Sequence, residues 1–174
     1  LSWCDRNKVA VYPRLDYTNL PNFPRESAQY PDFMDLEFRK MAKHGLDKVL
    51  NIIKNHRSVL AIDMDQRWLF DVDYSGEERY GSPKLGPKSI EYLPIWLKDR
   101  YQDIGGLNKA WGKDYAGFND VLNDKDVIID YHIKPLSNLP WRLDFIEYTL
   151  WTINDFLKEL TTYIKTIDPH HLIT

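Results

Sequence analysis

Residues 59–76 read VLAIDMDQRWLFDVDYSG and join an apolar run to a cluster of charged side chains. The run from Val59 to Ile62 is continuously apolar, which is typical of a strand in a parallel sheet. Polar and aromatic residues gather immediately after it: Asp63, Asp65, Gln66, Arg67 and Trp68. The stretch therefore predicts a buried strand that ends in a functional edge or, more simply, where the chain leaves the core for water.

The residues before this stretch complete a strand–helix–strand pattern. Lys8–Tyr12 is short and β-branched, and we expect a strand that ends near Pro13. From Asp35, which can cap a helix, apolar residues recur at three- and four-residue steps up to Ile53. The pattern predicts a βαβ unit with a parallel sheet covered on both faces.

The residues after the stretch predict two helices and a third strand. For residues 71–92 the glycines and prolines predict a long loop, and a helix that ends at Gly105-Gly106 follows it. For residues 119–140 the sequence predicts an irregular connection. A long amphipathic helix begins at Pro140, and its apolar residues recur at steps of four and three: Ile146, Leu150, Ile153, Leu157, Leu160, Ile164 and Ile167. The final HLIT begins a third strand. If the parent fold is a (β/α)8 barrel, three strands are present and five are missing.

The charge balance and the residue composition exclude some classes of binding partner and of covalent cross-link. Lys and Arg number 23 against 26 Asp and Glu, so we expect neither nucleic acid nor an anionic membrane as a partner. Aromatic residues make up 14% of the chain, which a core explains as well as stacking on pyranose rings does. Cys4 is the single cysteine, which excludes an intrachain disulfide. No signal peptide or membrane span is visible, and we expect a cytoplasmic protein.

Two strand ends supply the candidate site residues, because working side chains in parallel α/β folds lie where strands end. The first end offers Arg14 and Asp16. The second offers Asp63 and Asp65, which period-two alternation places on the same side of the strand. Two carboxylates so placed repel each other, which raises the pKa of one of them, and a general acid needs such a raised pKa. Alternatively, one Asp pairs with Arg14 or Arg67 and the other is solvated.

The remaining tryptophan and histidine candidates are explained at least as well by structural roles as by functional ones. Trp68 suits a stacking platform or a lid over the strand ends. The five histidines match no zinc-ligand spacing, and His170-His171 suits helix capping and strand entry, so we expect no metal. The nucleotide-binding and hydrolase-elbow motifs are absent from the sequence, and no cofactor is implied.

A specific resemblance lies in Trp96–Val121, WLKDRYQDIGGLNKAWGKDYAGFNDV. It is similar to the segment after the fourth barrel strand in β-galactosidase-like glycoside hydrolases of clan A, especially family 42. The residues from Arg142 to Thr174 resemble the helix and the start of the fifth strand that come next. With KNHRSVLAIDMD ahead of both, the resemblance covers roughly residues 36–174 in the right order.

The resemblance implies a (β/α)8 barrel that acts on glycosidic bonds with retention, with an acid/base carboxyl after strand four and a nucleophile after strand seven. The acid/base of that clan is the Glu of an Asn-Glu pair. Here Asp65-Gln66 or Gln66-Arg67 stands in its place, and neither pair supplies a Glu. Three explanations stay open. The acid is Asp65 or Asp63, the chain is an inactivated variant with Gln for Glu, or its lineage keeps a sugar-binding barrel without hydrolysis.

The sequence therefore predicts one partial-barrel domain over residues 1–174, comprising about strands three to five, with an insertion at about 71–139 between strand four and the long helix. We expect it to cleave or bind glycosides, with Asp65 and Asp63 as catalytic candidates. The expected substrate-binding residues are Arg14, Asp16, Gln66, Arg67 and Trp68. The expected partners are a carbohydrate and either the rest of the barrel or further copies of the chain, since three strands leave two open edges.

Overall fold

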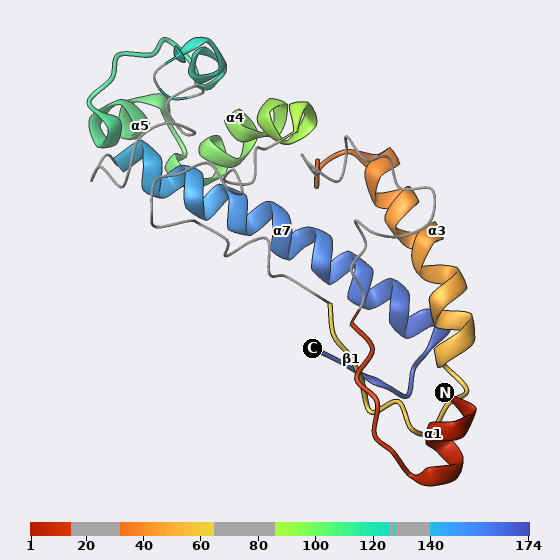
Figure 1. Cartoon of the computed structure of the whole chain (residues 1–174). Helices are drawn as coiled ribbons and strands as arrows, with labels where there is room; N and C mark the ends of the chain where they lie inside the picture. The colour runs from red at the N-terminus through yellow and green to blue at the C-terminus, as the bar shows by residue number, and fades with distance from the viewer. Residues whose placement is uncertain (15–31, 65–85, 126, 128–139) are drawn as a thin grey trace.

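The computed structural model describes residues 1–14, 32–64, 86–125, 127 and 140–174 (Figure 1). The elements in chain order are α1 (Ser2–Asn7), α3 (Leu36–Ile53), β1 (Ala61–Ile62), α4 (Pro87–Tyr101), α5 (Ile104–Trp111), the 3-10 helix η3 (Phe118–Asn123), α7 (Pro140–Ile167) and β2 (Leu172–Ile173). None of the helices in these ranges has the length and apolar content that a membrane span requires.

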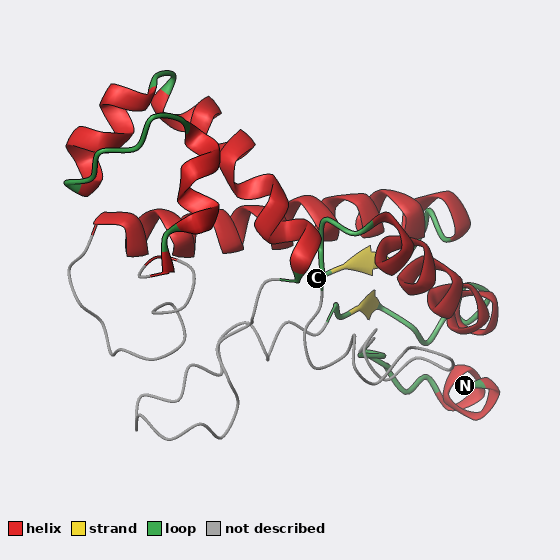
Figure 2. Cartoon of the chain, turned by 90° about the horizontal axis from the view of Figure 1, so that it is seen from above, coloured by secondary structure: helices red, strands yellow, loops and turns green. Residues whose placement is uncertain are grey.

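Three segments that are far apart in the sequence lie side by side in parallel. β1 pairs in parallel with β2. On the other side of β1, parallel bridges join Val11 to Val59 and Arg14 to Asp63. The predicted parallel order is thus confirmed, and the first predicted strand takes the form of two isolated bridges. Helices α3 and α7 connect the three segments in turn, which gives a β-α-β-α-β arrangement (Figures 1 and 2).

Helix α3 forms as its sequence predicts. The side chain of Asp35 accepts a hydrogen bond from the backbone N–H of Glu37 at 2.9 Å, which satisfies one of the free donors of the first turn. The strand after it departs from the prediction at one residue: Leu60 is 46% exposed, so the apolar run is not continuously buried.

Helix α7 carries two separate hydrophobic cores along its length. Figure 1 shows α3 beside one half of α7, and α4 and α5 beside the other. Its C-terminal half packs with α3 and β1 in the first core, which includes Phe33, Phe38, Leu46, Ile62, Ile153, Phe156, Leu160 and Ile164. Its N-terminal half packs with α4, α5 and η3 in the second core, which includes Leu93, Leu97, Leu107, Trp111, Val121, Trp141, Phe145 and Tyr148.

The buried face of α7 follows the predicted apolar stripe in one half of the helix. Ile153, Leu160 and Ile164 are buried as expected. In the other half, Ile146 and Leu150 are 37% and 42% exposed, so the prediction is wrong there. Aromatic residues one or two positions away take their place in the second core, because α4 and α5 approach the helix from a different side than α3 does.

The predicted helix that ends at Gly105-Gly106 is two helices. α4 ends at Tyr101, and both glycines lie in the first turn of α5. Asp103 caps α5 by accepting a hydrogen bond from the backbone N–H of Gly106 at 2.9 Å. The glycines therefore begin a helix instead of ending one. Part of each predicted loop is also helical, because α4 begins at Pro87 and η3 spans Phe118–Asn123.

The start of α4 is capped by a residue from a distant part of the chain. The buried carboxylate of Asp32 accepts hydrogen bonds from the backbone N–H of Lys88 at 2.6 Å and of Ser89 at 2.9 Å. A Cβ on Gly86 would lie 2.4 Å from the Cβ of Asp32, so only glycine allows this approach. The hydroxyl of Tyr148 donates to the carbonyl of Ser89, which ties the same turn to α7.

Candidate active site

The carboxyl ends of the three parallel segments meet at one edge of the sheet. The backbone N–H of Asp63 donates to the carbonyl of Pro13 at 3.0 Å, and that of Met64 donates to the carbonyl of Thr174 at 2.9 Å. These bonds place Arg14, Asp63 and Thr174 on adjacent strands at the same edge. This is the edge at which working residues lie in parallel α/β folds, and it is the candidate site.

Arg14 and Asp63 form an ion pair across this edge, with Arg14 Nε 3.0 Å from Asp63 Oδ2. Both side chains are partly exposed, so solvent screens the pair and it adds only about 0–1 kcal/mol to stability. Its contribution is positional, because it holds a carboxylate and a guanidinium where a ligand hydroxyl could meet both. The sequence left open whether one aspartate pairs with Arg14 or with Arg67, and in the structure Asp63 pairs with Arg14.

The other predicted site residues lie outside the described residues: Asp16, Asp65, Gln66, Arg67 and Trp68. The placement of Asp63 and Asp65 on the same side of the strand therefore stays a prediction. Among the described residues, no group of His, Cys, Asp and Glu is arranged to hold a metal ion.

The opposite edge of the sheet is held by two His–carboxylate pairs. Asp5 Oδ2 lies 2.5 Å from His56 Nδ1, and Asp5 Oδ1 accepts from the backbone N–H of Ser58 at 2.7 Å. These hydrogen bonds, the one from His56 first, lower the pKa of Asp5 to about 2. Asp168 Oδ2 lies 2.5 Å from His171 Nδ1. The Asp5–His56 pair joins distant parts of the chain, and the Asp168–His171 pair closes the turn between α7 and β2. Both pairs lie at the amino ends of the strands, where side chains serve stability in parallel α/β barrels.

The most specific part of the sequence resemblance has a structural role. Arg100 and Tyr101 from α4 and Trp111 from α5 all converge on Asp144 of α7, which is 3% exposed. Trp111 Nε1 donates to Asp144 Oδ2 at 2.7 Å, Arg100 Nε lies 2.9 Å from Oδ1, and the Tyr101 hydroxyl also donates. Asp144 is not among the residues predicted from the sequence. The available signal was a carboxylate that lies three positions after Trp141 and next to Phe145 on an amphipathic helix.

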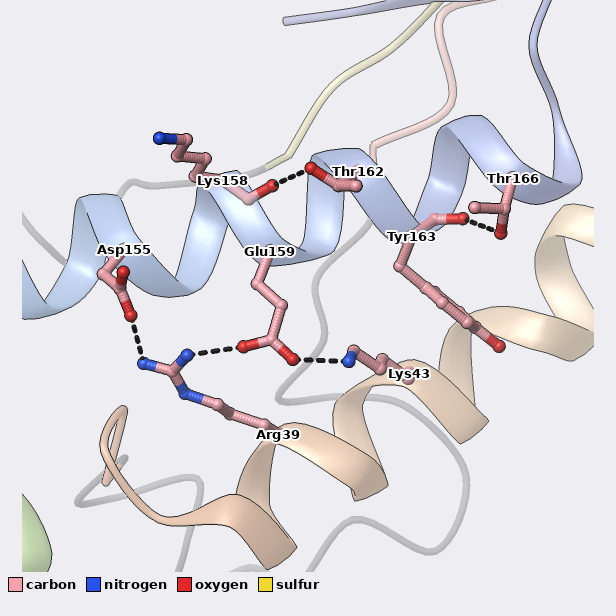
Figure 3. Close-up of a pocket in the computed structure, with 8 residues that line it drawn as sticks. All are labelled: Arg39, Lys43, Asp155, Lys158, Glu159, Thr162, Tyr163 and Thr166. Atoms are coloured by element: carbon pink, nitrogen blue, oxygen red, sulfur yellow. Dashed lines mark hydrogen bonds and ion pairs between the residues drawn. The ribbon is translucent and has the colours of Figure 1, made fainter.

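A groove of about 540 Å³ lies between α3 and α7, as Figure 3 shows. Arg39 donates to Asp155 at 2.7 Å and to Glu159 at 2.5 Å, and Lys43 also donates to Glu159. Burial opposes ionisation of Glu159, but the hydrogen bonds from Lys43 and Arg39 outweigh it and lower the pKa of its carboxyl. These cations and carboxylates satisfy one another, so the network joins two helices.

Parallel strands that alternate with helices and carry charged side chains at their carboxyl edge define an α/β protein. Residues 24–174 match glycoside hydrolase family 42, described as beta-galactosidase, and the chain belongs to this family. The resemblance read from the sequence is confirmed.

Two curated relatives are similar to part of the chain. The chain is 26% identical over 136 residues to "Probable mannan endo-1,4-beta-mannosidase C" of Aspergillus terreus, covering 74% of this chain and 30% of that protein. It is 26% identical over 90 residues to a beta-galactosidase of Arthrobacter, covering 48% of this chain and 12% of that protein. The chain therefore spans less than a third of the length of either relative.

Two agarases have a similar fold. The structure of an exo-beta-agarase superposes with a TM-score of 0.54 at 21% identity, over 82% of this chain and 19% of that one. A second agarase superposes with the same TM-score at 17% identity, over 99% of this chain and 25% of that one. The likeness in fold extends to nearly the whole chain.

Proposed function

We propose that this chain is part of a retaining glycoside hydrolase that acts on a neutral glycan, with its substrate at the carboxyl edge of the sheet. The observation that carries the proposal is the match to family 42 over residues 24–174. The Arg14–Asp63 pair at that edge supports it, because a carboxylate beside a guanidinium offers both acceptors and donors to sugar hydroxyls. We further propose that the three strands are strands three to five of the barrel.

In the proposed mechanism, Asp65 is the acid/base. It protonates the glycosidic oxygen while a carboxylate from a strand beyond Thr174 attacks the anomeric carbon, which releases the leaving group and forms a glycosyl ester. Asp65 then removes a proton from water, which hydrolyses that ester with net retention. Asp63 is the less suitable acid because the Arg14 guanidinium donates to it, and we assign it to binding substrate hydroxyls. Asp16, Arg67 and Trp68 are proposed to complete the binding edge.

The test is hydrolysis by the complete protein of a neutral panel: nitrophenyl β-galactoside, nitrophenyl β-mannoside, β-1,4-mannan and agarose. We expect Asp65→Asn to lower kcat by roughly 10²- to 10⁴-fold, the usual contribution of a general acid/base. Asp63→Asn should mainly raise KM. Proton NMR of the first-formed product shows whether its anomeric configuration is the same as that of the substrate. Activity that survives Asp65→Asn unchanged, or an inverted product, contradicts the mechanism.

A second candidate is a carbohydrate-binding protein without hydrolysis, and the absence of Glu at Asp65-Gln66-Arg67 favours it. Hydrolysis of the panel by the unchanged protein separates this candidate from the hydrolase proposal. If the unchanged protein is inactive, the variant Gln66→Glu separates an inactivated hydrolase from a binding protein. If the protein is an inactivated hydrolase, Gln66→Glu creates activity that the unchanged protein lacks. If copies of the chain complete one another's open edges, its mass in solution is a multiple of 20.7 kDa.

A further inference from the structure

A second groove, of about 450 Å³, lies where α4 crosses the N-terminal half of α7. It is lined by five residues of α4 and one of α7: Tyr92, Ile95, Trp96, Asp99, Arg100 and Trp151. The groove shares no residue with the Arg14–Asp63 edge. On α4, Leu93 and Leu97 are completely buried in the second core, whereas Tyr92 and Trp96 pack against that core and are only partly buried. Trp151 does not belong to the core.

The aromatic side chains of the groove are stacked and held in place. The rings of Tyr92 and Trp151 lie 5.7 Å apart at an angle of 11°, and the ring of Tyr148 stacks on Trp151 at 6.0 Å and 18°. Centroid separations of this size belong to offset stacks, which leave part of each ring face uncovered. Trp151 is 36% exposed. The groove thus offers a preorganised apolar surface, which a flat ring of C–H groups can cover at little entropic cost.

Polar groups of both signs border this surface. The guanidinium of Arg100 lies 5.3 Å from the centroid of the Trp96 ring and is fixed by ion pairs to Asp144 and Glu147. Burial opposes the charge of Arg100, but these carboxylates outweigh it and raise the pKa of the guanidinium. Asp99 adds an exposed carboxylate. One cation and one anion leave the lining without net charge, which suits a neutral ligand with many hydroxyls better than a phosphate or an acidic sugar.

The contrast with the groove of Figure 3 sharpens this assignment. That groove is lined mainly by charged side chains that pair with one another, and Tyr163 is its one aromatic residue. The α4–α7 groove instead combines aromatic rings with a few polar groups, the composition of sites that bind small organic ligands. A pyranose has the matching chemistry, because it pairs an apolar C–H face with hydroxyls around its rim.

We propose that the α4–α7 groove binds a neutral pyranose unit of a glycan, as a second saccharide site in addition to the carboxyl edge. The apolar face of the sugar lies on Trp151 and Tyr92, and its hydroxyls donate to Asp99 and accept from Arg100. The inference does not depend on hydrolysis, since binding at this groove requires none of the residues in the proposed mechanism.

The test is binding of hexasaccharides of the neutral panel, mannohexaose and agarohexaose, to the complete protein by calorimetry and tryptophan fluorescence. We expect Trp151→Ala to weaken binding about tenfold, in line with the energy of one aromatic stacking contact. Asp99→Ala should weaken it several-fold, and this exposed substitution keeps the proposal testable if Trp151→Ala unfolds the helix pair. Lys98→Ala, next to Asp99 but outside the groove, is the matched control and should bind like the unchanged protein.

Each outcome decides the proposal separately from the hydrolase proposal. Weaker binding by Trp151→Ala and Asp99→Ala but not Lys98→Ala supports the groove, whether or not the protein hydrolyses the panel. The groove is overturned if neither hexasaccharide binds saturably, or if both groove variants bind normally. Binding that is lost in Asp63→Asn and kept in the groove variants assigns the sugar to the carboxyl edge, which overturns this inference and leaves the hydrolase proposal intact.

Discussion

The two halves of α7 pack in different ways. Around its C-terminal half, aromatic and aliphatic side chains from α3 and β1 form an apolar core, and the charged residues stay at its border. Around its N-terminal half, the core contains the buried carboxylate of Asp144, which three side chains of α4 and α5 share. The packing around the C-terminal half is stabilised by close packing and buried apolar area, and the packing around the N-terminal half depends on hydrogen-bond geometry as well.

The largest expected effect lies in the first core. Phe156 is fully buried, with its ring 5.3 Å and 5.4 Å from those of Phe33 and Phe38. Phe156→Ala should therefore cost about 4 kcal/mol of unfolding free energy through lost burial and the cavity it leaves. Urea unfolding measures the loss, and hydrogen exchange should show α3 losing protection before α4 does. Leu143→Ala, exposed on the same helix, is the control. Equal loss of protection in α3 and α4 would show that the two cores unfold as one unit.

The next effect lies in the second core. Asp144→Ala removes the shared acceptor and leaves the Trp111 N–H and the Tyr101 hydroxyl without it, at a cost of about 3 kcal/mol. Here α4 and α5 should lose protection from exchange while α3 keeps it. Glu147→Ala removes the exposed partner of the same Arg100 and should cost less than about 1 kcal/mol. Similar losses of unfolding free energy from Asp144→Ala and Glu147→Ala would mean that Asp144 contributes no more to stability than an exposed charge does.

A smaller effect tests the contact between α4 and α7. Tyr148→Phe keeps the buried ring and removes the hydrogen bond to the carbonyl of Ser89, so we expect a loss of about 1 kcal/mol. Tyr163→Phe makes the matched change in the other half of α7, where the hydroxyl bonds to Asp47 at a partly exposed site. Denaturation midpoints should fall more for Tyr148→Phe. The reverse order would contradict the greater dependence of the second core on hydrogen bonds.

The mildest test is acidification, which acts at the amino edge of the sheet. Hydrogen bonds from His56 and Ser58 lower the pKa of Asp5 to about 2, against about 4 in an unfolded chain. The folded state thus gains stability from ionised Asp5 above about pH 4 and loses it as the pH falls toward 2. Unfolding free energies at pH 5, 4 and 3 should fall less steeply in Asp5→Asn than in the unchanged chain. Identical slopes would show that this pair does not contribute.

The helices and the parallel order of the strands could be read from the sequence because local signals agree with tertiary packing. Asp35 caps α3, Pro140 begins α7, and the apolar run at Val59 forms a strand. The sequence does not predict the start of α5, because paired glycines usually end helices, whereas here the N-cap at Asp103 places Gly105 and Gly106 in the first turn of α5.

The rest required contacts between distant residues. The rotation of the buried face of α7 and the burial of Asp144 depend on where α4 and α5 dock, which no local pattern encodes. At the candidate site, the sequence placed Arg14 and Asp63 at the strand ends. It left their pairing open, because which carboxylate Arg14 meets is set by the bridge between two strands that lie 49 positions apart in the sequence.

The position of α7 in the chain has a consequence for biosynthesis. Both cores draw buried residues from Pro140–Ile167, so neither can close until the ribosome has made the part of α7 that it contains. Until then the apolar faces of α3 and α4 lack their partner helix and stay open to chaperones, and a pause in translation before the codon for Pro140 would prolong that exposure. One late helix thus sets the time at which two otherwise separate cores become protected from aggregation.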